Sequence, residues 1–363
     1  MSIYESRQWM ADIDEILAYF PEFEELAGKS VMVTGAAGLI CSSVVDILMR
    51  YNDTHKDKVV VYAAGRQPEK IISRFSNRVE QEEFRYVAYD ALKTDNRLDF
   101  DCDYIIHGAG NSFPGAIVAE PVETMLSHFA GIKCLLDYAK EHGTTKTLYI
   151  SSSEVYGQNE GNQPYCEGEY GYIDLLNARN SYSMAKRAAE TLCASYFDEY
   201  GVESVIVRPG HVYGPTASPD DNRVSSSWAY AAARGEDIVM KSDGGQLRSY
   251  CYCLDCASAI LKVLLRGENV HAYNISNPDS VVTIRQMAEL LAKAAQVQLR
   301  MELPTEEERK GFNLMRNSSL DSASLRSLGW KGLFNAEKGF LHTVDILKEI
   351  LSAENASVKG SRL

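Results

Sequence analysis

Hydrophobic residues occur along the chain in short runs, several of which are followed by longer stretches with helical spacing. The first run, Ser30–Gly35, is rich in β-branched residues, and glycines and an apolar stretch from Leu39 to Tyr51 follow it directly. Similar runs recur as far as residue 210. They are Lys58–Gly65, Phe84–Asp90, Asp103–Gly110, Thr147–Ser153 and Glu203–Gly210. Apolar strands that alternate with helices predict an α/β fold, a Rossmann-like doubly wound parallel sheet covered on both faces.

The alternation weakens after Gly210, where shorter strands and helices follow a loop with two prolines. This change predicts a smaller C-terminal lobe rather than a second copy of the first pattern, and we expect a flexible end to the chain. The predicted parts are a helical N-terminal extension (1–27), a Rossmann domain (28–210), a lobe that is partly interleaved with it (211–350) and a flexible tail (351–363).

Composition excludes several classes of function. The 363 residues carry a formal net charge of -13, so nonspecific binding to nucleic acid or to an anionic membrane surface is not expected. No apolar stretch approaches the roughly 18 residues that span a bilayer, and the first twenty residues do not resemble a secretory signal. The eight cysteines are scattered rather than placed at disulfide-framework spacings. We therefore expect a cytoplasmic protein.

Three of the cysteines lie close together, at Cys251, Cys253 and Cys256. A metal site is one interpretation, but no histidine is near and the spacing differs from that of paired zinc knuckles. We interpret them as buried strand cysteines and expect no metal.

A glycine turn follows the first predicted strand, with Gly35, Gly38 and then Cys41 at intervals of three. Glycines let backbone N–H groups approach a pyrophosphate, and the N-terminus of the following helix favours its negative charge. The turn therefore predicts a dinucleotide site, although Cys41 stands where a third glycine would complete the pattern. We expect a small thiol to be tolerated there.

The end of the second strand bears on which dinucleotide binds. An acidic side chain there binds the ribose 2′-OH of NAD, whereas an arginine suits the 2′-phosphate of NADP. The chain has Arg66 and no acid in this place, which leans toward NADP or toward no preference.

Tyr182 and Lys186 lie four residues apart and so on one face of a predicted helix. A lysine ammonium close to a phenol favours the phenolate, and a tyrosine so placed can act as a base near neutral pH. If the pair stood alone, the alternative interpretation would be that Tyr182 and Lys186 are two exposed neighbours on an ordinary helix with no catalytic role.

The motifs "HGAG", "SSSEVYG", Y-x-x-x-K and "RPGHVYGP" follow the glycine turn in that order. Together they resemble the extended short-chain dehydrogenase/reductases that modify nucleotide sugars, over about residues 29 to 332. The resemblance implies a catalytic triad of Ser152, Tyr182 and Lys186, with Glu154 as a candidate for the second stage. These enzymes usually hold NAD. The resemblance therefore favours NAD as the cofactor, although Arg66 leans toward NADP, which stays the alternative.

The same resemblance assigns the binding residues, with the C-terminal lobe holding the substrate. The expected cofactor contacts are Gly35, Gly38, Leu39, Ile40, Arg66, Asp90, Ala91, Gly108, Ala109, Gly110, Tyr182, Lys186, Pro209 and His211. The expected nucleotide-sugar contacts are Ser153, Arg179, His211, Arg223, Val224 and Arg248. His211 replaces an asparagine that is frequent in the family, and a structural salt bridge is the other interpretation of Arg248.

The resemblance also narrows the reaction, which would pass through a 4-keto sugar. Dehydratases carry an aspartate where this chain has Ser153, and a serine is a poor general acid, so dehydration is disfavoured. UDP-glucuronate decarboxylases share "SEVYG" and an arginine three residues before the tyrosine, here Arg179, whereas 4-epimerases usually lack the glutamate. Decarboxylation and 4-epimerisation both stay open at this point.

Two further alternatives, and one expected partner, follow from the sequence and the resemblance. Glu154 could cap its turn and take no part in a reaction. The chain could bind a dinucleotide as a regulator without turnover, although the complete set of serine, tyrosine and lysine argues against this. Most relatives are homodimers packed through the tyrosine helix and the helix before it, and both predicted helices are apolar enough for a homodimer here.

Overall fold

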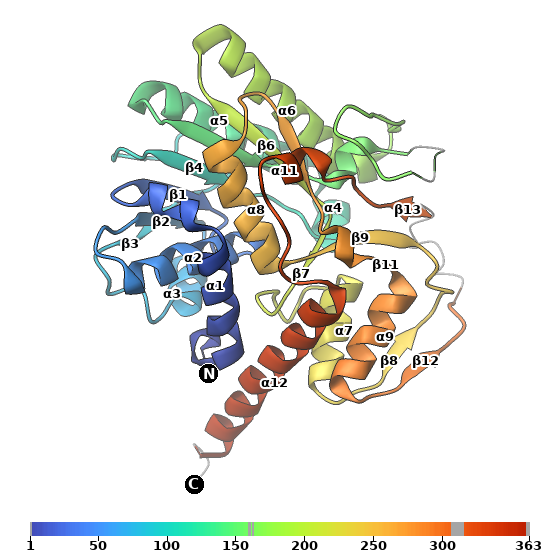
Figure 1. The fold of residues 1–363 in the computed structure, drawn as a ribbon. Coiled ribbons are helices and arrows are strands. Elements are labelled where there is room, and N and C mark those ends of the chain that lie inside the picture. Colours follow the sequence, from blue (N-terminus) through green and yellow to red (C-terminus); the bar gives the residue numbers. More distant parts are fainter. Residues whose placement is uncertain (1, 159–160, 162, 306–315, 361–363) are drawn as a thin grey trace.

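A computed structural model of the chain describes residues 2–158, 161, 163–305 and 316–360 (Figure 1). Its centre is a seven-stranded parallel sheet with the strand order β10-β6-β5-β4-β1-β2-β3. The strands are β1 (Ser30–Thr34), β2 (Val60–Gly65), β3 (Phe84–Ala88), β4 (Tyr104–His107), β5 (Lys146–Ile150), β6 (Ser204–Pro209) and β10 (Ala272–Ile275). The predicted α/β fold is confirmed.

Helices cover both faces of this sheet. On one face lie α5 (Pro121–His142) and α6 (Ser181–Tyr200), and on the other α2 (Leu39–Thr54) and α8 (Cys253–Arg266) (Figure 1). Side chains of β1 alternate between the two layers: Val31 and Val33 pack in one hydrophobic cluster and Met32 in the other. The two short helices of this half are α3 (Pro68–Arg74) and α4 (Pro114–Ala119).

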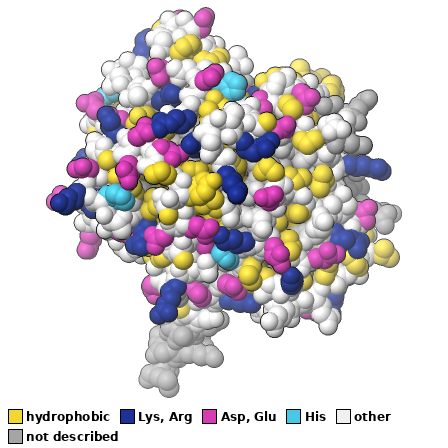
Figure 2. All heavy atoms as spheres, in the orientation of Figure 1, with side chains coloured by type: hydrophobic (Ala, Val, Ile, Leu, Met, Phe, Trp, Pro, Cys, Tyr) yellow, Lys and Arg dark blue, Asp and Glu magenta, His cyan; other side chains and the backbone are white. Residues whose placement is uncertain are grey.

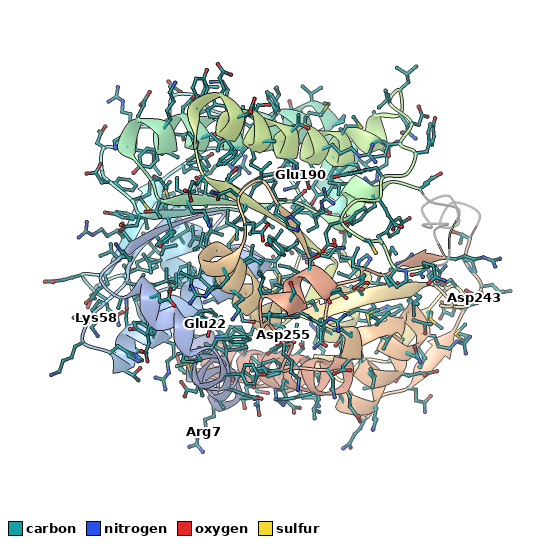
Figure 3. The ribbon with its side chains drawn as sticks, turned by 45° about the horizontal axis from the view of Figure 1, so that its top comes forward. Arg7, Glu22, Lys58, Glu190, Asp243 and Asp255 are labelled. Carbon is teal, nitrogen blue, oxygen red and sulfur yellow. The ribbon has the colours of Figure 1, made fainter. Side chains whose placement is uncertain are left out.

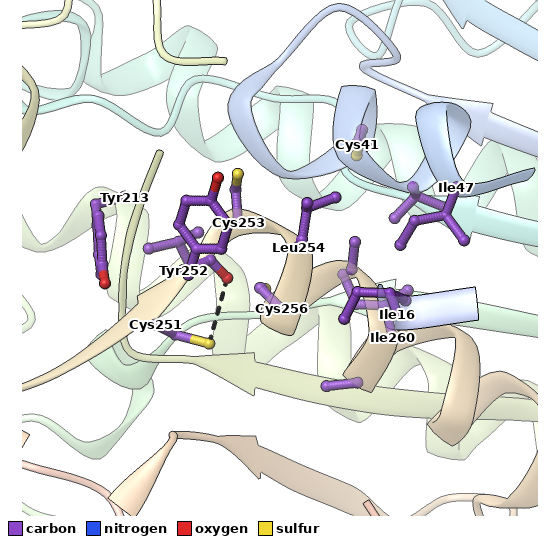
Figure 4. Close-up of a cluster of buried hydrophobic side chains, with 14 of the residues drawn as sticks. Ile16, Cys41, Ile47, Tyr213, Cys251, Tyr252, Cys253, Leu254, Cys256 and Ile260 are labelled. Atoms are coloured by element: carbon purple, nitrogen blue, oxygen red, sulfur yellow. Dashed lines mark hydrogen bonds between the residues drawn. The ribbon is translucent and has the colours of Figure 1, made fainter. Parts of the chain in front are cut away.

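The N-terminal segment is helical and packs into the main core. A turn at Ile3–Glu5, α1 (Arg7–Tyr19) and a turn at Pro21–Leu26 precede β1. Its buried apolar residues recur at helical spacing, as in Trp9, Ile13, Ile16 and Phe20. Figure 4 shows Ile16 in one cluster with Ile47 of α2 and Ile260 of α8. The segment is thus a structural part of the first core.

The remaining elements form the C-terminal lobe. They are β7 (His211–Tyr213), α7 (Val224–Ala233), β8 (Ile238–Met240), β9 (Leu247–Tyr252), β11 (Val281–Thr283), α9 (Ile284–Ala295), β12 (Leu299–Met301), β13 (Asn317–Ser318), α11 (Ala323–Ser327) and α12 (Ala336–Gly360). Strand β10 and helix α8 come from this half of the sequence yet belong to the main sheet and its cover, so the two halves interleave.

Helix α12 continues through Gly360, beyond the start of the expected flexible tail. Residues 351–360 are therefore helical, because the helical pattern of the preceding turns runs on without a glycine or proline until the end of the helix. Residues 361–363 of that expected tail lie outside the described residues.

The three clustered cysteines are buried, as interpreted, but only Cys251 lies on a strand. Cys253 and Cys256 begin helix α8, so the prediction of strand cysteines is wrong for these two (Figure 4). Their burial raises the pKa of the Cys253 thiol to about 12. Within the described part of the chain, no group of three His, Cys, Asp or Glu side chains could hold a metal ion.

Charge is mixed on the surface. On the face drawn in Figure 2, acidic and basic side chains are interspersed around scattered hydrophobic ones. None of the helices in the described ranges is long and apolar enough to cross a membrane.

Candidate functional site

The predicted site residues gather at the carboxyl ends of the parallel strands. The chain runs outward from β1 through β2 to β3 and then crosses to β4 on the other side of β1, and this switch in strand order is where α/β sheets bind ligands. Gly35 follows β1, Gly108 follows β4 and Ser152 lies just beyond β5, while Pro209 ends β6. These residues therefore share one edge of the sheet.

The glycine turn packs its backbone closely against the segment that follows β4. Gly35 has φ +70°, and a Cβ on it would lie 3.0 Å from the backbone nitrogen of Ala109. Gly38 is the N-cap of α2 and supplies no side chain to its first N–H groups. Such a cradle fits a dinucleotide pyrophosphate.

Cys41 is accommodated by a glycine opposite it. Its buried thiol occupies the position where a Cβ on Gly108 would stand. Burial raises the pKa of this thiol to about 12, so it is a neutral packing group. The departure from the glycine pattern is thus tolerated because the residue that follows β4 has no side chain.

The strand ends beside this turn hold the other expected cofactor residues. Arg66 is exposed immediately after β2. Asp90 follows β3 and accepts a hydrogen bond from the Leu92 N–H at 3.1 Å, while the adjacent Ala91 is buried close to Gly131 of α5. These residues fit a nicotinamide dinucleotide.

Ser152, Tyr182 and Lys186 are brought together. Tyr182 and Lys186 lie on the first two turns of α6, and Ser152 lies beyond β5, where its hydroxyl hydrogen-bonds the Tyr182 phenol. The Lys186 Nζ donates to the Ile150 carbonyl at 2.6 Å and lies 5.6 Å from the centroid of the Tyr182 ring. The three side chains predicted as a triad therefore converge beside the cofactor segments.

Burial sets the protonation of the tyrosine and lysine. It raises the pKa of Tyr182 to about 12, helped by the charge of Glu154 and opposed by the hydrogen bond from Ser152. It lowers the pKa of Lys186 to about 7, opposed mainly by Glu190. The lowered tyrosine pKa that the sequence predicted is not found, because desolvation of the phenol outweighs the neighbouring cations.

Glu154 faces the tyrosine helix. It lies on a short turn (Ser153–Tyr156), and its carboxylate accepts a hydrogen bond from the Ser183 hydroxyl at 3.1 Å and pairs with Arg179 at 3.5 Å. The turn is capped by Ser152, whose hydroxyl accepts from the Glu154 N–H at 3.1 Å. The Glu154 side chain is 43% exposed and close enough to Tyr182 for its charge to raise the tyrosine pKa. Ser152, and not Glu154, caps the turn.

The expected substrate residues continue from the tyrosine into the C-terminal lobe. Arg223 is the N-cap of α7, before the half-exposed Val224, and its guanidinium binds Asp221 through two nitrogens. Arg248 is buried on β9, and desolvation lowers its pKa. His211 is accessible to solvent yet walled in by protein. This enclosure lowers its pKa to about 4, and the charges of Arg248 and Arg223 add to the effect.

Two groups near the triad were missed from the sequence. His128 of α5 meets the Tyr182 ring edge-on, with centroids 5.1 Å apart, and donates from Nε2 to the Asn111 carbonyl at 2.9 Å. Glu190 lies one turn after Lys186 and pairs with Arg208 of β6. The spacing of Lys186 and Glu190 is visible in the sequence, whereas nothing there pairs His128 with the tyrosine.

Comparison with known proteins agrees with this geometry. Residues 31–276 match the NAD dependent epimerase/dehydratase family. UDP-glucuronic acid decarboxylase 6 of Arabidopsis thaliana is 32% identical over 262 residues, which cover 71% of this chain and 72% of that protein.

Two solved structures have the same fold. UDP-glucose 4-epimerase of Thermotoga maritima, with UDP-glucose, gives a TM-score of 0.74 at 23% identity, covering 89% of this chain and 99% of that one. RMD of Pseudomonas aeruginosa, complexed with NADPH, gives 0.68 at 24% identity, covering 88% and 99%.

The fold and the convergent serine, tyrosine and lysine define an extended short-chain dehydrogenase/reductase. The chain belongs to the NAD-dependent epimerase/dehydratase family, whose members are enzymes that act on nucleotide sugars with NAD or NADP.

Proposed function

We propose that this protein oxidises a nucleotide sugar at C4 and decarboxylates the resulting 4-keto acid, as a UDP-glucuronate decarboxylase does. The observation that carries the proposal is the pair of Glu154 and Arg179 beside Tyr182. The 32% identity over 262 residues to a UDP-glucuronic acid decarboxylase supports it. Glu154 and Arg179 supply a carboxylate and a cation where a 5-carboxylate on the sugar would lie.

The chain's own residues account for the proton movements. Tyr182 takes the proton from the 4-hydroxyl, and Ser152 hydrogen-bonds the reacting oxygen. Tyr182 acts from its phenolate form, which Lys186 stabilises when protonated, and it becomes a phenol on taking the proton; Lys186 would also bind the cofactor ribose. NAD would supply the hydride acceptor and donor for C4.

Glu154 and Arg179 act in the second stage. In the 4-keto acid the C5–C6 bond breaks, carbon dioxide leaves, and the electron pair moves onto the C4 oxygen, which Ser152 and Tyr182 contact. Arg179 orients the carboxylate before it leaves. C5 then takes a proton from a solvent water molecule that the Glu154 carboxylate orients, and the electron pair on the C4 oxygen returns to restore the ketone. Tyr182 returns its proton to the C4 oxygen when the hydride comes back.

Dehydration is disfavoured because Ser153 stands where a general acid would be needed. A 4-epimerase is the second candidate. It needs only the triad, all of which converges here, and a sugar that can present either face of C4 to the cofactor. A dinucleotide-binding regulator would need no such convergence.

Purified protein incubated with UDP-glucuronate and with UDP-glucose tests the proposal, with products followed by mass and NMR. We expect loss of carbon dioxide from UDP-glucuronate. Tyr182→Phe should lower kcat on the order of 100-fold or more, because general base catalysis contributes about 10²–10⁴. Glu154→Gln should slow the second stage and allow the 4-keto sugar to accumulate.

Other outcomes separate the alternatives. An unchanged Glu154→Gln variant would leave epimerisation as the better proposal if UDP-glucose is turned over. Activity that is absent with every nucleotide sugar, or equal in Tyr182→Phe, would support the regulator. The dinucleotide released on denaturation identifies the cofactor, and we propose that it is NAD. Release of NADP would instead mean that Arg66 sets the cofactor preference.

A further inference from the structure

A buried ion pair lies beneath the helix that carries the tyrosine and lysine. Arg208 of β6 donates from Nε to Glu190 Oε1 at 3.0 Å and from Nη2 to Oε2 at 2.6 Å. The side chains of Arg208 and Glu190 are 2% and 10% exposed. Figure 3 shows Glu190 on the side of α6 that faces the sheet. Such a forked, desolvated pair has a fixed geometry.

This pair is connected to the site through the end of β5. The Ser151 hydroxyl donates to Glu190 Oε1 at 2.5 Å. The residue before Ser151 is Ile150, whose carbonyl accepts the hydrogen bond from Lys186 at 2.6 Å. The residue after it is Ser152, which binds the phenol of the site. One carboxylate therefore anchors the strand end that carries both contacts.

The charge of Glu190 also acts on the lysine. Glu190 lies four residues after Lys186 on the same side of α6, and its charge raises the lysine pKa against the desolvation that lowers it to about 7. The other groups around Lys186 are neutral. They are Tyr182 on the same helix, Tyr149 on β5, His107 on β4, His128 on α5 and Cys41 on α2. Glu190 adds a negative charge to this neutral surrounding.

We propose that Glu190 is a positioning residue for the reaction proposed above: through Ser151 it fixes the strand end that holds Lys186 and Ser152, and its negative charge faces the lysine ammonium. Arg208 orients the carboxylate for this task. The proposal rests on the proposed function for its kinetic consequences, whereas its effect on the lysine itself does not depend on any substrate.

A structural salt bridge is the alternative. Removing one partner of a buried pair strongly lowers stability whatever the role of the pair, so loss of activity alone decides nothing. The test therefore needs variants that differ in charge and contact, together with a readout that follows Lys186.

Four variants of the full chain separate these roles. Glu190→Gln removes the charge and keeps the shape, while Glu190→Asp keeps the charge on a shorter side chain. Ser151→Ala removes the connection and leaves the ion pair. Glu199→Gln is the matched control, because it removes the same charge from an exposed position on the same helix.

The first readout is the titration of Lys186, followed by NMR in protein labelled with ¹³C at the lysine ε-carbon and assigned with Lys186→Met. We expect its pKa to fall in Glu190→Gln and to stay near the wild-type value in Glu190→Asp and Glu199→Gln. An unchanged titration in a folded Glu190→Gln protein overturns the proposal. So does an equal fall in the control.

The second readout is the pH profile of kcat with the nucleotide sugar that is turned over. In Glu190→Gln the basic limb should move to lower pH, because the ammonium form is lost earlier. Its kcat should fall by about tenfold or more with little change in KM, since a misplacement of about 1 Å can cost on the order of 100-fold. Ser151→Ala should lower kcat without moving the limb. If the wild type turns over no nucleotide sugar, the proposed function fails while the Lys186 titration still tests Glu190.

If Glu190→Gln does not fold, Glu190→Asp and Ser151→Ala still decide the matter. Wild-type kcat in both would show that neither contact positions the site, and the ion pair would then be structural.

Discussion

At the scale of single residues, the contact between Cys41 and Gly108 explains how the unusual glycine turn is tolerated. Because the thiol occupies the place of a Cβ on Gly108, Gly108→Ala should overpack this junction of α2 and β4. Overpacking of this kind costs about 1–3 kcal/mol. We expect a lower free energy of unfolding in urea and weaker dinucleotide binding.

The control for this prediction is Gly168→Ala, where a Cβ would meet nothing within 4 Å. Combining Gly108→Ala with Cys41→Ala should recover most of the loss, since the clashing sulfur is then absent. A double variant as unstable as Gly108→Ala alone would mean that another neighbour sets the cost.

Much of the site could be predicted from residue spacing, because each part is local. Tyr182 and Lys186 are four residues apart on one helix, and Ser152 lies at the end of an apolar run. Their environment could not be predicted in this way. Burial raises the pKa of Tyr182 to about 12, and the pairing of Glu190 with Arg208 joins separate elements that only the folded sheet brings together.

At the scale of elements, helix α1 is part of the main hydrophobic core and not a peripheral extension. The sequence predicts a helix there, but its docking on α2 and α8 depends on which distant apolar faces are complementary. The end of α12 was also not predicted from the local pattern: residues 351–360 were expected to form a flexible tail, and they are helical. Local pattern thus predicts an element better than its partner or its last turn.

Trp9 tests the role of α1, because its side chain is fully buried. Trp9→Ala should lower the free energy of unfolding by about 3–5 kcal/mol, as expected for deleting a large buried aromatic side chain. Chemical denaturation followed by circular dichroism measures this. Tyr19→Ala, on the same helix at a position 48% exposed, should change stability little. Similar values for the two variants would mean that α1 is not part of the cooperative core.

At the scale of the whole molecule, an apolar stripe on α4 and α5 favours assembly. Val118, Val122, Met125, Leu126 and Phe129 are 40–66% exposed, and apart from the adjacent Met125 and Leu126 they follow one another at intervals of three or four residues. We propose that a second copy of the chain covers them in a homodimer. Light scattering should show a dimer that Val122→Glu combined with Leu126→Glu converts to monomer, because buried unpaired charges are costly.

The control is Ile72→Glu, which alters an exposed apolar residue on α3 and should leave the dimer intact. A wild-type monomer, or a dimer that survives both glutamates, would contradict the homodimer. Its interface would then lie elsewhere or be absent.

Stability of the whole molecule should fall in mild acid because of buried neutral histidines. His107 is fully buried and hydrogen-bonds the Thr34 hydroxyl at 2.7 Å, and burial lowers its pKa to about 3 from an ordinary 6.5. Between these values the unfolded chain binds a proton that the folded chain does not. The free energy of unfolding should therefore decrease as pH falls from about 6.5 toward 3, by up to about 1.4 kcal/mol per pH unit for this group.

Urea denaturation at several pH values between 7 and 4.5 measures this slope, a range that stays above most carboxylate titrations. His107→Gln should make the slope shallower, since the glutamine takes up no proton in either state. His142→Gln, at an exposed position, should leave it close to the wild-type value. If His107→Gln keeps the full slope, other groups cause the acid sensitivity, and the next to test is His128, whose pKa burial also lowers.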